Sequence, residues 1–230
     1  MRLVDAYKTI WAGKMEGIQP PDQQHIDRVV WTEELFGDAT GPLLDVGCGS
    51  GSMLARAKAH DWKTVGLDID WTVAEWLRNA GYDAFCCNVD VGAWSLDDGA
   101  FGIATLCDVI EHVLDPAHVL SEAARVLVPG GHLYVGTPNC SYWERPLQLS
   151  RGSMFRTSGD NVLKDGGHIG YYGPGDLSDV IRGAGFCDVR IHYRNLSPPD
   201  PPIKVALETA GMWNGECNEY SYMIAEAVKP

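Results

Sequence analysis

The sequence predicts an α/β fold in which an open, doubly wound and mostly parallel sheet carries helices on both faces. Three observations support this prediction. Short apolar runs alternate with helix-length amphipathic stretches from residue 42 to residue 136. The repeated units have the size of right-handed strand–helix–strand crossovers. The chain has 230 residues, enough for one domain with a sizeable core.

The expected elements follow one another along the chain. Strands are predicted at residues 42–46, 63–67, 83–88, 101–107 and 132–136, with helices at 52–60, 72–79 and 116–127. Asp70 is the expected N-cap of the second of these helices, which leaves Asp68 available for a ligand. Pro129-Gly130-Gly131 is expected to form a turn before the fifth strand.

The regions on either side of this alternating core are less regular. A short helix is expected around Tyr7–Met15 and a longer one from Asp22 to near Gly37, so residues 1–37 would be N-terminal cap helices. Residues 138–172 are rich in turn formers and aromatics, and long irregular stretches inside compact domains are usually functional. We expect a lid there. Residues 173–230 complete the single domain, with helices at 175–184 and 203–213 and strands at 187–193 and 220–228.

Composition excludes several classes of protein. Lysine plus arginine is 18 and aspartate plus glutamate is 31, giving a formal net charge of −13, which argues against a nucleic-acid binder. No apolar stretch approaches the length of a membrane span, and the first residues lack the apolar core of a secretory signal. The seven cysteines are odd in number and form no CxxC pair, so a cytoplasmic location is expected.

The most informative segment is Leu43–Gly51, where a strand leads through Gly47, Gly49 and Gly51 into a helix. Glycines let the backbone turn sharply and approach a ligand closely. The spacing is GxGxG, which argues against a nicotinamide or flavin site because those sites use GxGxxG. The alternative is a tight strand–helix turn that binds nothing.

Two carboxylates follow the next two strands. Asp68 ends the second strand, where a carboxylate can accept hydrogen bonds from both hydroxyls of a ribose. Asp90 follows the third strand, where it can accept from an adenine amino group. Each alone could be an ordinary loop acid. Their order after the glycine loop favours a nucleoside-binding site.

The segment Asp45–Gly51, followed by Asp68 and Asp90, resembles the class I S-adenosylmethionine-dependent methyltransferases over about residues 40–190. Arg125–Thr137, with its Pro-Gly-Gly turn, matches the family's segment after the helix. The resemblance implies a Rossmann-like, seven-stranded sheet with an antiparallel last strand. It also implies S-adenosylmethionine as cofactor and S-adenosylhomocysteine as product, and the branch is similar to ubiquinone-pathway O-methyltransferases.

The resemblance places the cofactor in residues 40–137. The glycine loop would lie against the methionine part, Asp68 would hold the ribose, and Asp90 would meet the adenine. The full set implied is Asp45, Gly47, Cys48, Gly49, Gly51, Asp68, Ile69, Asn88, Val89, Asp90 and Cys107. One departure is Phe101-Gly102, where the family often has Phe-Asp.

Candidate chemistry lies in Cys107–Pro116, after the fourth strand and at the edge where such sheets bind ligands. His112 is the natural base for a hydroxyl acceptor, because imidazole titrates near neutral pH. Glu111 and His168 are the other catalytic candidates. The alternative is a histidine that only orders the loop.

The same loop can also be interpreted as a metal site. Asp108, Glu111, His112 and His168 are similar to the ligands of two metal-using groups, the ubiquinone-pathway O-methyltransferases and the small-RNA 2′-O-methyltransferases. The acid-x-x-Glu-His pattern is also widespread without a metal, and Asp108 is shorter than the usual Glu. We therefore expect no metal.

The leading expectation is methyl transfer to a hydroxyl of a small molecule, with no membrane partner and either a monomer or a homodimer. Alternatives are metal-assisted RNA 2′-O-methylation, a nicotinamide oxidoreductase and a non-catalytic cofactor-binding partner. The net charge of −13 opposes the RNA reading. The expected walls of the acceptor pocket are aromatic: Tyr171, Tyr172, Trp143, Phe155, Trp11 and Tyr7.

Overall fold

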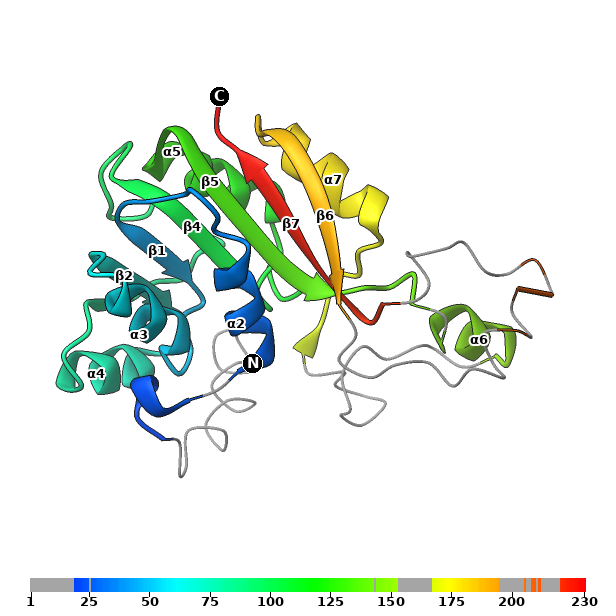
Figure 1. Ribbon diagram of the computed structural model, residues 1–230, viewed down its shortest axis with the longest axis horizontal. Helices are drawn as coiled ribbons and strands as arrows, with labels where there is room; N and C mark the ends of the chain where they lie inside the picture. The colour runs from blue at the N-terminus through cyan, green and yellow to red at the C-terminus, as the bar shows by residue number, and fades with distance from the viewer. Residues whose placement is uncertain are drawn as a thin grey trace.

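A seven-stranded sheet forms the centre of the protein, with the strand order β3-β2-β1-β4-β5-β7-β6 (Figure 1). The computed structural model describes residues 19–24, 26–142, 144–152, 167–194, 205, 208–209, 211 and 220–230. The helix expected at Tyr7–Met15 lies outside this range, as does most of the helix expected at 203–213. The strands are β1 (Leu43–Val46), β2 (Thr64–Asp68), β3 (Ala84–Cys86), β4 (Phe101–Cys107), β5 (Leu127–Pro138), β6 (Cys187–Arg194) and β7 (Tyr222–Val228).

The sheet is parallel from β3 to β5 and changes direction at β7. β1 pairs in parallel with both β2 and β4, whereas β7 runs antiparallel to β5 and to β6. The mostly parallel sheet with an antiparallel last strand is therefore confirmed. Because β1 lies between β2 and β4, the chain reverses its direction of winding there, and ligands bind at such a reversal.

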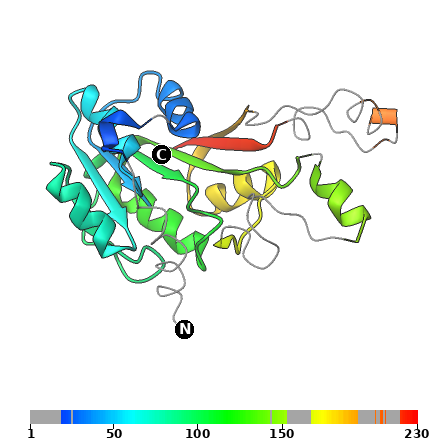
Figure 2. The same ribbon diagram turned by 90° about the horizontal axis from the view of Figure 1, so that it is seen from below.

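Helices cover both faces of the sheet (Figure 2). Alternate residues of a strand point to opposite faces, and the core divides accordingly. Leu43 packs in one cluster with Val29 of α2 and Met53 of α3. Leu44 packs in another with Val119 of α5 and Leu177 of α7. The helices are η1 (Pro21–Gln23, 3₁₀), α2 (Asp27–Glu34), α3 (Ser52–Ala59), α4 (Trp71–Asn79), α5 (Pro116–Val126), α6 (Glu144–Ser150) and α7 (Pro174–Gly183).

The central strand β4 is buried along nearly all of its length. Its residues Phe101–Leu106 are all buried, which explains why this stretch is continuously apolar rather than alternating. Burying one Leu or Ile side chain stabilises a fold by about 1.5–3 kcal/mol. β4 contributes to two of the three core clusters, with Ile103 in one and Leu106 in the other.

Three local predictions are wrong or incomplete. The helix expected from Asp22 is split, because Pro21 starts a 3₁₀ turn and α2 begins only at Asp27. The expected turn at 129–131 belongs to β5. Gly130 donates its N–H to the Lys229 carbonyl (2.8 Å), which continues the ladder, and its φ of 77° allows the bend. The third strand is shorter than expected.

There is a steric reason for glycine at position 102, where the resemblance leads one to expect an acid. A Cβ atom on Gly102 would collide with the Thr40 carbonyl oxygen. The Gly102 N–H donates to the Pro42 carbonyl at 2.9 Å, so the segment before β1 lies directly against the start of β4. This close approach leaves no room for a side chain.

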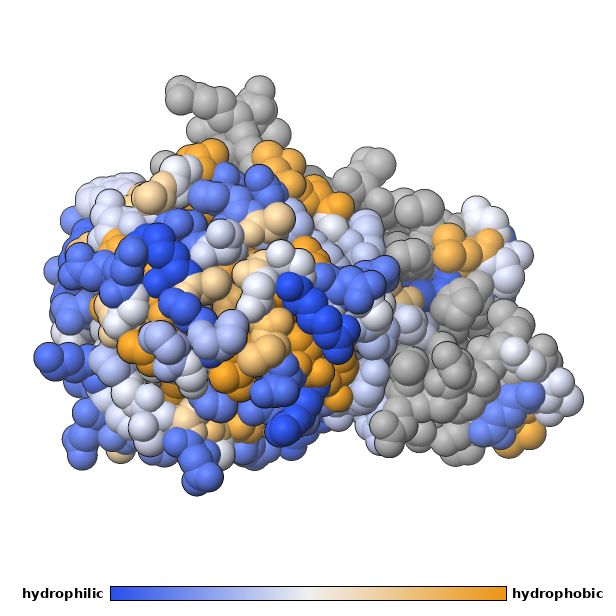
Figure 3. All heavy atoms as spheres, turned by 90° about the horizontal axis from the view of Figure 1, so that it is seen from above, coloured by the Kyte–Doolittle hydropathy of each residue, from blue (hydrophilic) through white to orange (hydrophobic). Residues whose placement is uncertain are grey.

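The stretch expected to be a lid includes α6, which lies away from the sheet, beyond the end of β5 (Figure 1). In the view from above, hydrophilic residues cover much of the surface, with hydrophobic residues scattered among them (Figure 3). Among the described residues, no helix is both long and apolar enough to cross a bilayer.

Candidate active site

A cleft of about 430 Å³ lies at the carboxyl ends of β1, β2, β3 and β4. This volume falls within the range of roughly 300–1,000 Å³ that small-molecule sites occupy. The loops that follow these strands line the cleft, together with the N-terminal segment that leads into α2. The predicted cofactor residues on its wall are Asp45, Gly47, Cys48, Gly49, Asp68, Ile69, Asn88, Val89, Asp90 and Cys107.

The glycine loop is folded against the end of β2. The N–H groups of Gly47 and Cys48 both donate to the Leu67 carbonyl, at 2.7 and 2.9 Å. Gly47 has a φ of 69°, and a Cβ atom there would collide with Val109. The loop therefore needs glycine both for its left-handed backbone and for its contact with the loop after β4.

Gly51 is the one predicted cofactor residue that does not line the cleft. It is the N-cap of α3 with a φ of 75°, and a Cβ atom there would collide with Leu77 and approach Pro21. Its requirement for glycine is structural, because the first turn of α3 packs on α4. The GxGxG spacing alone does not separate this role from contact with a ligand.

Asp45 is a buried carboxyl group at the floor of the cleft. Only 4% of it is exposed, and it accepts a hydrogen bond from the Thr105 hydroxyl at 2.7 Å. Burial raises the pKa of Asp45 to about 7; the Thr105 bond opposes this shift and the charge of Asp68 adds to it. A cation bound in the cleft would favour the ionised form.

Asp68 lies between the glycine loop and α4. One oxygen accepts from the Gly49 N–H and the other from the Asp70 N–H, both at 2.9 Å. Burial raises the pKa of Asp68, although these two bonds oppose the shift. Asp70 caps α4 through the Thr72 N–H at 2.9 Å, which confirms the predicted N-cap. Asp68 remains on the wall of the cleft.

The segment after β3 forms the adjoining wall. Asp90 does not extend freely into the cleft, because its Oδ1 accepts from the N–H groups of Leu114 at 2.8 Å and Asp115 at 3.1 Å. These bonds tie the Asn88–Asp90 segment to the loop after β4. Asn88 and Val89 lie beside Asp90 on the cleft wall.

Arg28 brings α2 into the site. It lines the cleft and forms an ion pair with Asp108, whose Oδ1 also accepts from the Tyr222 hydroxyl at 2.9 Å. Burial lowers the pKa of Arg28, but the charge of Asp108 and smaller contributions from Tyr222 and Cys107 together raise it by more, so the net shift is upward. Asp108 has a φ of 55°, a strained conformation for a non-glycine residue.

Arg28 and Gln24 line the cleft but are not predicted from the sequence. The helix is predicted from its apolar stripe, and a charged residue beside such a stripe is by default directed to solvent. The partner of Arg28 follows it by eighty positions in the chain, so no local pattern links them. The only sequence feature that could indicate a place for Arg28 in the cleft is its position between the apolar residues Ile26 and Val29.

The loop after β4 carries the predicted chemistry. His112 lines the cleft and is 8% exposed, and its Nδ1 lies 3.2 Å from the Gly167 carbonyl oxygen. Glu111 lies behind the wall, where its Oε2 accepts from the Thr137 hydroxyl at 2.9 Å. The carbonyl of Glu111 also accepts the N–H groups of Ile169 (2.8 Å) and Gly170 (2.9 Å), which fixes residues 167–170 against this loop.

Glu111, His112 and His168 form a compact buried cluster. The rings of His112 and His168 are 4.6 Å apart at an angle of 71°. The Nε2 atom of His168 lies 3.9 Å from Oε1 of Glu111, and this oxygen has no hydrogen-bond partner among the described residues. Burial, followed by the charge of Asp108, raises the pKa of Glu111 well above its usual range.

Three of the four residues of the metal hypothesis come together in this cluster, with ligand atoms within 4.8 Å of one another. One carboxylate and two imidazoles are a suitable donor set for a divalent ion. Asp108 is not part of it, because it is paired with Arg28 and Tyr222. Within the described part of the chain, this cluster therefore offers three donors.

Two of the six aromatic residues predicted to line the acceptor pocket lie in the described part of the chain. Tyr172 is half-buried against the core and donates to the Ile110 carbonyl at 3.4 Å, whereas Tyr171 is 37% exposed. Neither lines the described cleft. Tyr7, Trp11, Trp143 and Phe155 lie outside the described residues.

A family model described as a methyltransferase domain matches residues 24–191. An uncharacterized 37.1 kDa protein of a Streptomyces fradiae transposon is 36% identical over 135 residues, which are 54% of this chain and 38% of that protein. A ubiquinone biosynthesis O-methyltransferase of Thiobacillus denitrificans is 34% identical over 119 residues, covering 49% of this chain and 50% of that enzyme. The matches thus span half or less of these relatives.

The fold is also similar to solved structures. A crystal structure from Thermotoga maritima, described as a SAM-dependent methyltransferase and possible histamine N-methyltransferase, superposes with a TM-score of 0.68. The superposition covers 100% of both chains at 18% sequence identity. At this identity the similarity shows a shared fold only. The names of the similar proteins include an O-methyltransferase and a possible N-methyltransferase, so they differ in the atom that is methylated.

Proposed function

The chain belongs to the family of this methyltransferase domain, and on that premise we propose that it transfers a methyl group from S-adenosylmethionine to a hydroxyl of a small molecule. The resemblance to class I methyltransferases is thereby confirmed. The observation that carries the proposal is the cleft itself, which has the glycine loop and Asp68 in one part and His112 in another.

The cofactor fits the residues of the cleft. A Cβ atom on Gly49 would meet no atom closer than 3.9 Å, so the lack of a side chain there leaves room for a ligand. In this proposal Asp68 would hold the ribose and the Asn88–Asp90 segment would meet the adenine. We assign the amino-acid end to Asp45 and Arg28, because a carboxylate and a guanidinium complement an ammonium and a carboxylate. In this arrangement the Arg28 guanidinium would pair with the carboxylate of the ligand, either in place of its ion pair with Asp108 or in addition to it.

The cofactor supplies an electrophilic methyl group on a sulfonium ion. The chain has to align the acceptor with that methyl and remove a proton from the hydroxyl. In the tautomer that carries its proton on Nδ1, His112 donates to the Gly167 carbonyl, which leaves Nε2 unprotonated and able to accept the proton.

Glu111 and His168 support this proton transfer. A carboxyl group 3.9 Å from Nε2 of His168 can stabilise positive charge on the histidine pair after His112 accepts a proton. Burial raises the pKa of Glu111, and positive charge on the nearby imidazoles would favour its ionised form. Both residues act through His112 rather than on the acceptor.

Oxygen is the preferred acceptor atom, because ubiquinone biosynthesis O-methyltransferases are among the relatives and a histidine base suits a hydroxyl. A small acceptor is favoured over RNA by the net charge of −13. The lid role of residues 138–172 and the cytoplasmic location are part of this proposal.

Calorimetric titration with S-adenosylhomocysteine tests the cofactor site. We expect the wild type to bind with micromolar affinity and Asp68→Asn to bind at least about tenfold more weakly, because ribose donors would face an amide. Asp83→Asn, an exposed acid before β3, is the matched control. Equal binding by Asp68→Asn and the wild type would contradict the role of Asp68.

Turnover of His112→Ala tests the catalytic role. Its kcat on a catechol or another small hydroxylated acceptor is expected to fall about a hundredfold with cofactor affinity unchanged. His60→Ala, an exposed histidine on α3's far end, serves as the control. Repeating the assay with EDTA and then with Mg²⁺, Mn²⁺ or Zn²⁺ separates a general base from a metal ligand.

A further inference from the structure

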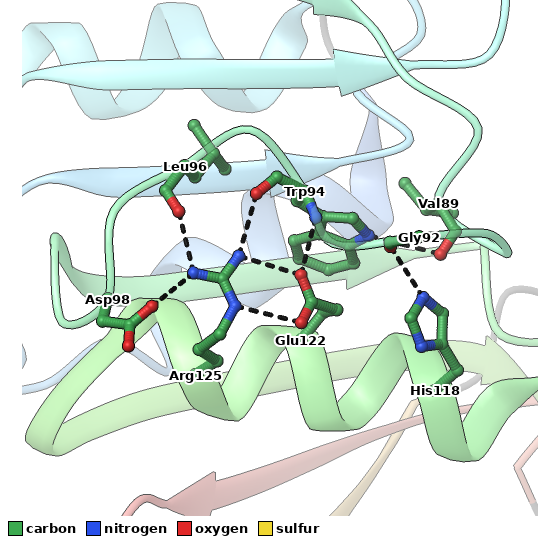
Figure 4. Close-up of polar contacts among 8 residues, drawn as sticks. All are labelled: Val89, Gly92, Trp94, Leu96, Asp98, His118, Glu122 and Arg125. Atoms are coloured by element: carbon green, nitrogen blue, oxygen red, sulfur yellow. Dashed lines mark hydrogen bonds and ion pairs between the residues drawn. The ribbon is translucent and has the colours of Figure 1, made fainter.

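The segment between β3 and β4 lacks regular secondary structure over most of its length, yet it forms part of the cleft wall. Figure 4 shows that side chains from α5 reach across to it and hold its backbone. The contacts come from residues 118, 122 and 125, which lie on one side of that helix. None of these residues lines the cleft.

Arg125 and Glu122 form the main attachment. Arg125 donates to the backbone carbonyls of Trp94 (2.9 Å) and Leu96 (2.8 Å), and to the Asp98 carboxylate at 2.6 Å. Glu122 accepts the Trp94 N–H at 2.6 Å and is itself held by two hydrogen bonds from Arg125. The hydrogen bond from Arg125 lowers the pKa of Glu122, so this carboxylate is charged at neutral pH.

Trp94 connects Arg125 and Glu122 to the wall of the cleft. Its ring is 2% exposed, and its indole N–H donates to the Val89 carbonyl at 3.2 Å. A second tie joins Nε2 of His118 to the Gly92 carbonyl at 3.0 Å. A continuous chain of contacts thus runs from Arg125 through Trp94 to Val89, which faces the cleft.

The side-chain hydrogen bonds of Arg125 all go to Glu122 or to this segment, and none goes to the sheet. The backbone of the segment is fixed at its ends, where the Cys87 N–H donates to the Asp68 carbonyl (2.7 Å) and the Gly99 N–H to the Arg125 carbonyl (3.0 Å). Between these ends, the wall is held by the side chains of α5 and by Asp90, which accepts hydrogen bonds from the loop after β4. A loop that is fixed before a ligand arrives loses less conformational entropy on binding.

We propose that Glu122 and Arg125 are positioning residues that act through Trp94 to set the wall contacting the nucleoside end of the cofactor. The inference rests on the proposed function, because it assumes that the Asn88–Asp90 segment meets a nucleoside. Losing the attachment would weaken binding of the nucleoside and leave the methyl-transfer step intact.

The test measures the affinities of S-adenosylhomocysteine and adenosine for Arg125→Met, which keeps the length of the side chain and removes its donors. Both dissociation constants are expected to rise about tenfold, with kcat at saturating cofactor within about twofold of wild type. Arg182→Met is the matched control, because Arg182 lies exposed on α7 and pairs with Asp179.

Trp94→Phe is the second variant, since it keeps an aromatic ring in the core and removes the indole N–H to Val89 together with the five-membered part of the indole. Amide hydrogen exchange of residues 88–96 should be faster than wild type in both variants without ligand. Unchanged dissociation constants in both variants, or a lower kcat with unchanged affinity, would overturn the inference alone. A wild-type protein that does not bind S-adenosylhomocysteine would overturn the proposed function and this inference together.

Discussion

Asp45 is a buried carboxyl group, and no positively charged side chain among the described residues pairs with it. Its one described side-chain partner is the Thr105 hydroxyl, and its pKa is raised to about 7 by burial. In the unfolded chain the same group titrates near pH 4. The folded chain therefore binds more protons than the unfolded chain between about pH 4 and pH 7, so Asp45 lowers stability progressively as the pH rises through this window.

Binding of S-adenosylhomocysteine is expected to depend on pH in the opposite direction. The ammonium of the ligand favours ionised Asp45, so the affinity should rise by up to about tenfold per pH unit towards pH 7 and level off above it. Calorimetry from pH 5.5 to 8.5 measures this slope. Asp45→Asn should flatten it and Asp83→Asn should keep it; an equal slope in Asp45→Asn would assign the dependence to another group.

Gly47 and Gly81 separate two reasons for glycine. Gly47→Ala combines a φ of 69° with a collision against Val109, whereas Gly81→Ala combines a φ of 84° with open space. Gly81→Ala should cost about 1 kcal/mol of unfolding free energy, and Gly47→Ala about 1–3 kcal/mol more together with loss of cofactor binding. Chemical denaturation measures both; equal costs would mean that Val109 moves aside freely.

The elements that the sequence predicts well are those with strong local patterns. β4 is a continuous apolar run, and α5 carries its apolar stripe behind Asp115, which caps it through the His118 N–H. For elements whose limits depend on residues far along the chain, the predicted limits are wrong. β5 starts early because Leu127 pairs with Phe101 of β4 and because Gly130 and Gly131 pair with Lys229.

The same distinction applies to the site. The glycine loop, Asp68 and His112 could be predicted because each follows a strand with a recognisable pattern. The pair Arg28–Asp108 and the attachment of Trp94 to Arg125 could not, because each joins residues whose separation in sequence is fixed only by the folded sheet. Aromatic residues gave weak guidance, since packing and binding use the same side chains.

Helix α2 gives a matched pair of variants at the scale of elements. Arg28 of α2 pairs with Asp108 and lines the cleft, whereas Arg56 of α3 pairs with Glu33 of α2 away from it. Arg28→Met should weaken binding of S-adenosylhomocysteine by about tenfold or more, and Arg56→Met should not change it. Calorimetry decides; equal binding by both variants would remove Arg28 from the cofactor site.

At the scale of the whole molecule, β4 is shared by two core clusters, and we expect these clusters to unfold together as one cooperative unit. Ile103 and Leu106 are both fully buried, but they belong to different clusters on opposite faces of the sheet. The cleft lies at the end of this strand and extends over its neighbours. The stability of the core and the geometry of the site therefore depend on the same central strands.

Core truncations should accordingly unfold the protein in one transition. Ile103→Ala and Leu106→Ala should each lower the free energy of unfolding by about 2–5 kcal/mol. Val91→Ala, at an exposed position, should change it by less than about 0.5 kcal/mol. Denaturation followed by fluorescence and by circular dichroism measures this. Two separate transitions in either core variant would show that the clusters unfold independently.

The place of β7 between β5 and β6 has a consequence for how the chain is made. Among the described strands, β6 has β7 as its only neighbour in the sheet, yet β6 leaves the ribosome first. Until β7 follows, β6 has no strand to pair with, and the edge of β5 stays open with unpaired N–H and carbonyl groups. Exposed strand edges recruit other chains. Biogenesis of this protein therefore passes through an interval of aggregation risk that closes only when the antiparallel strand is inserted.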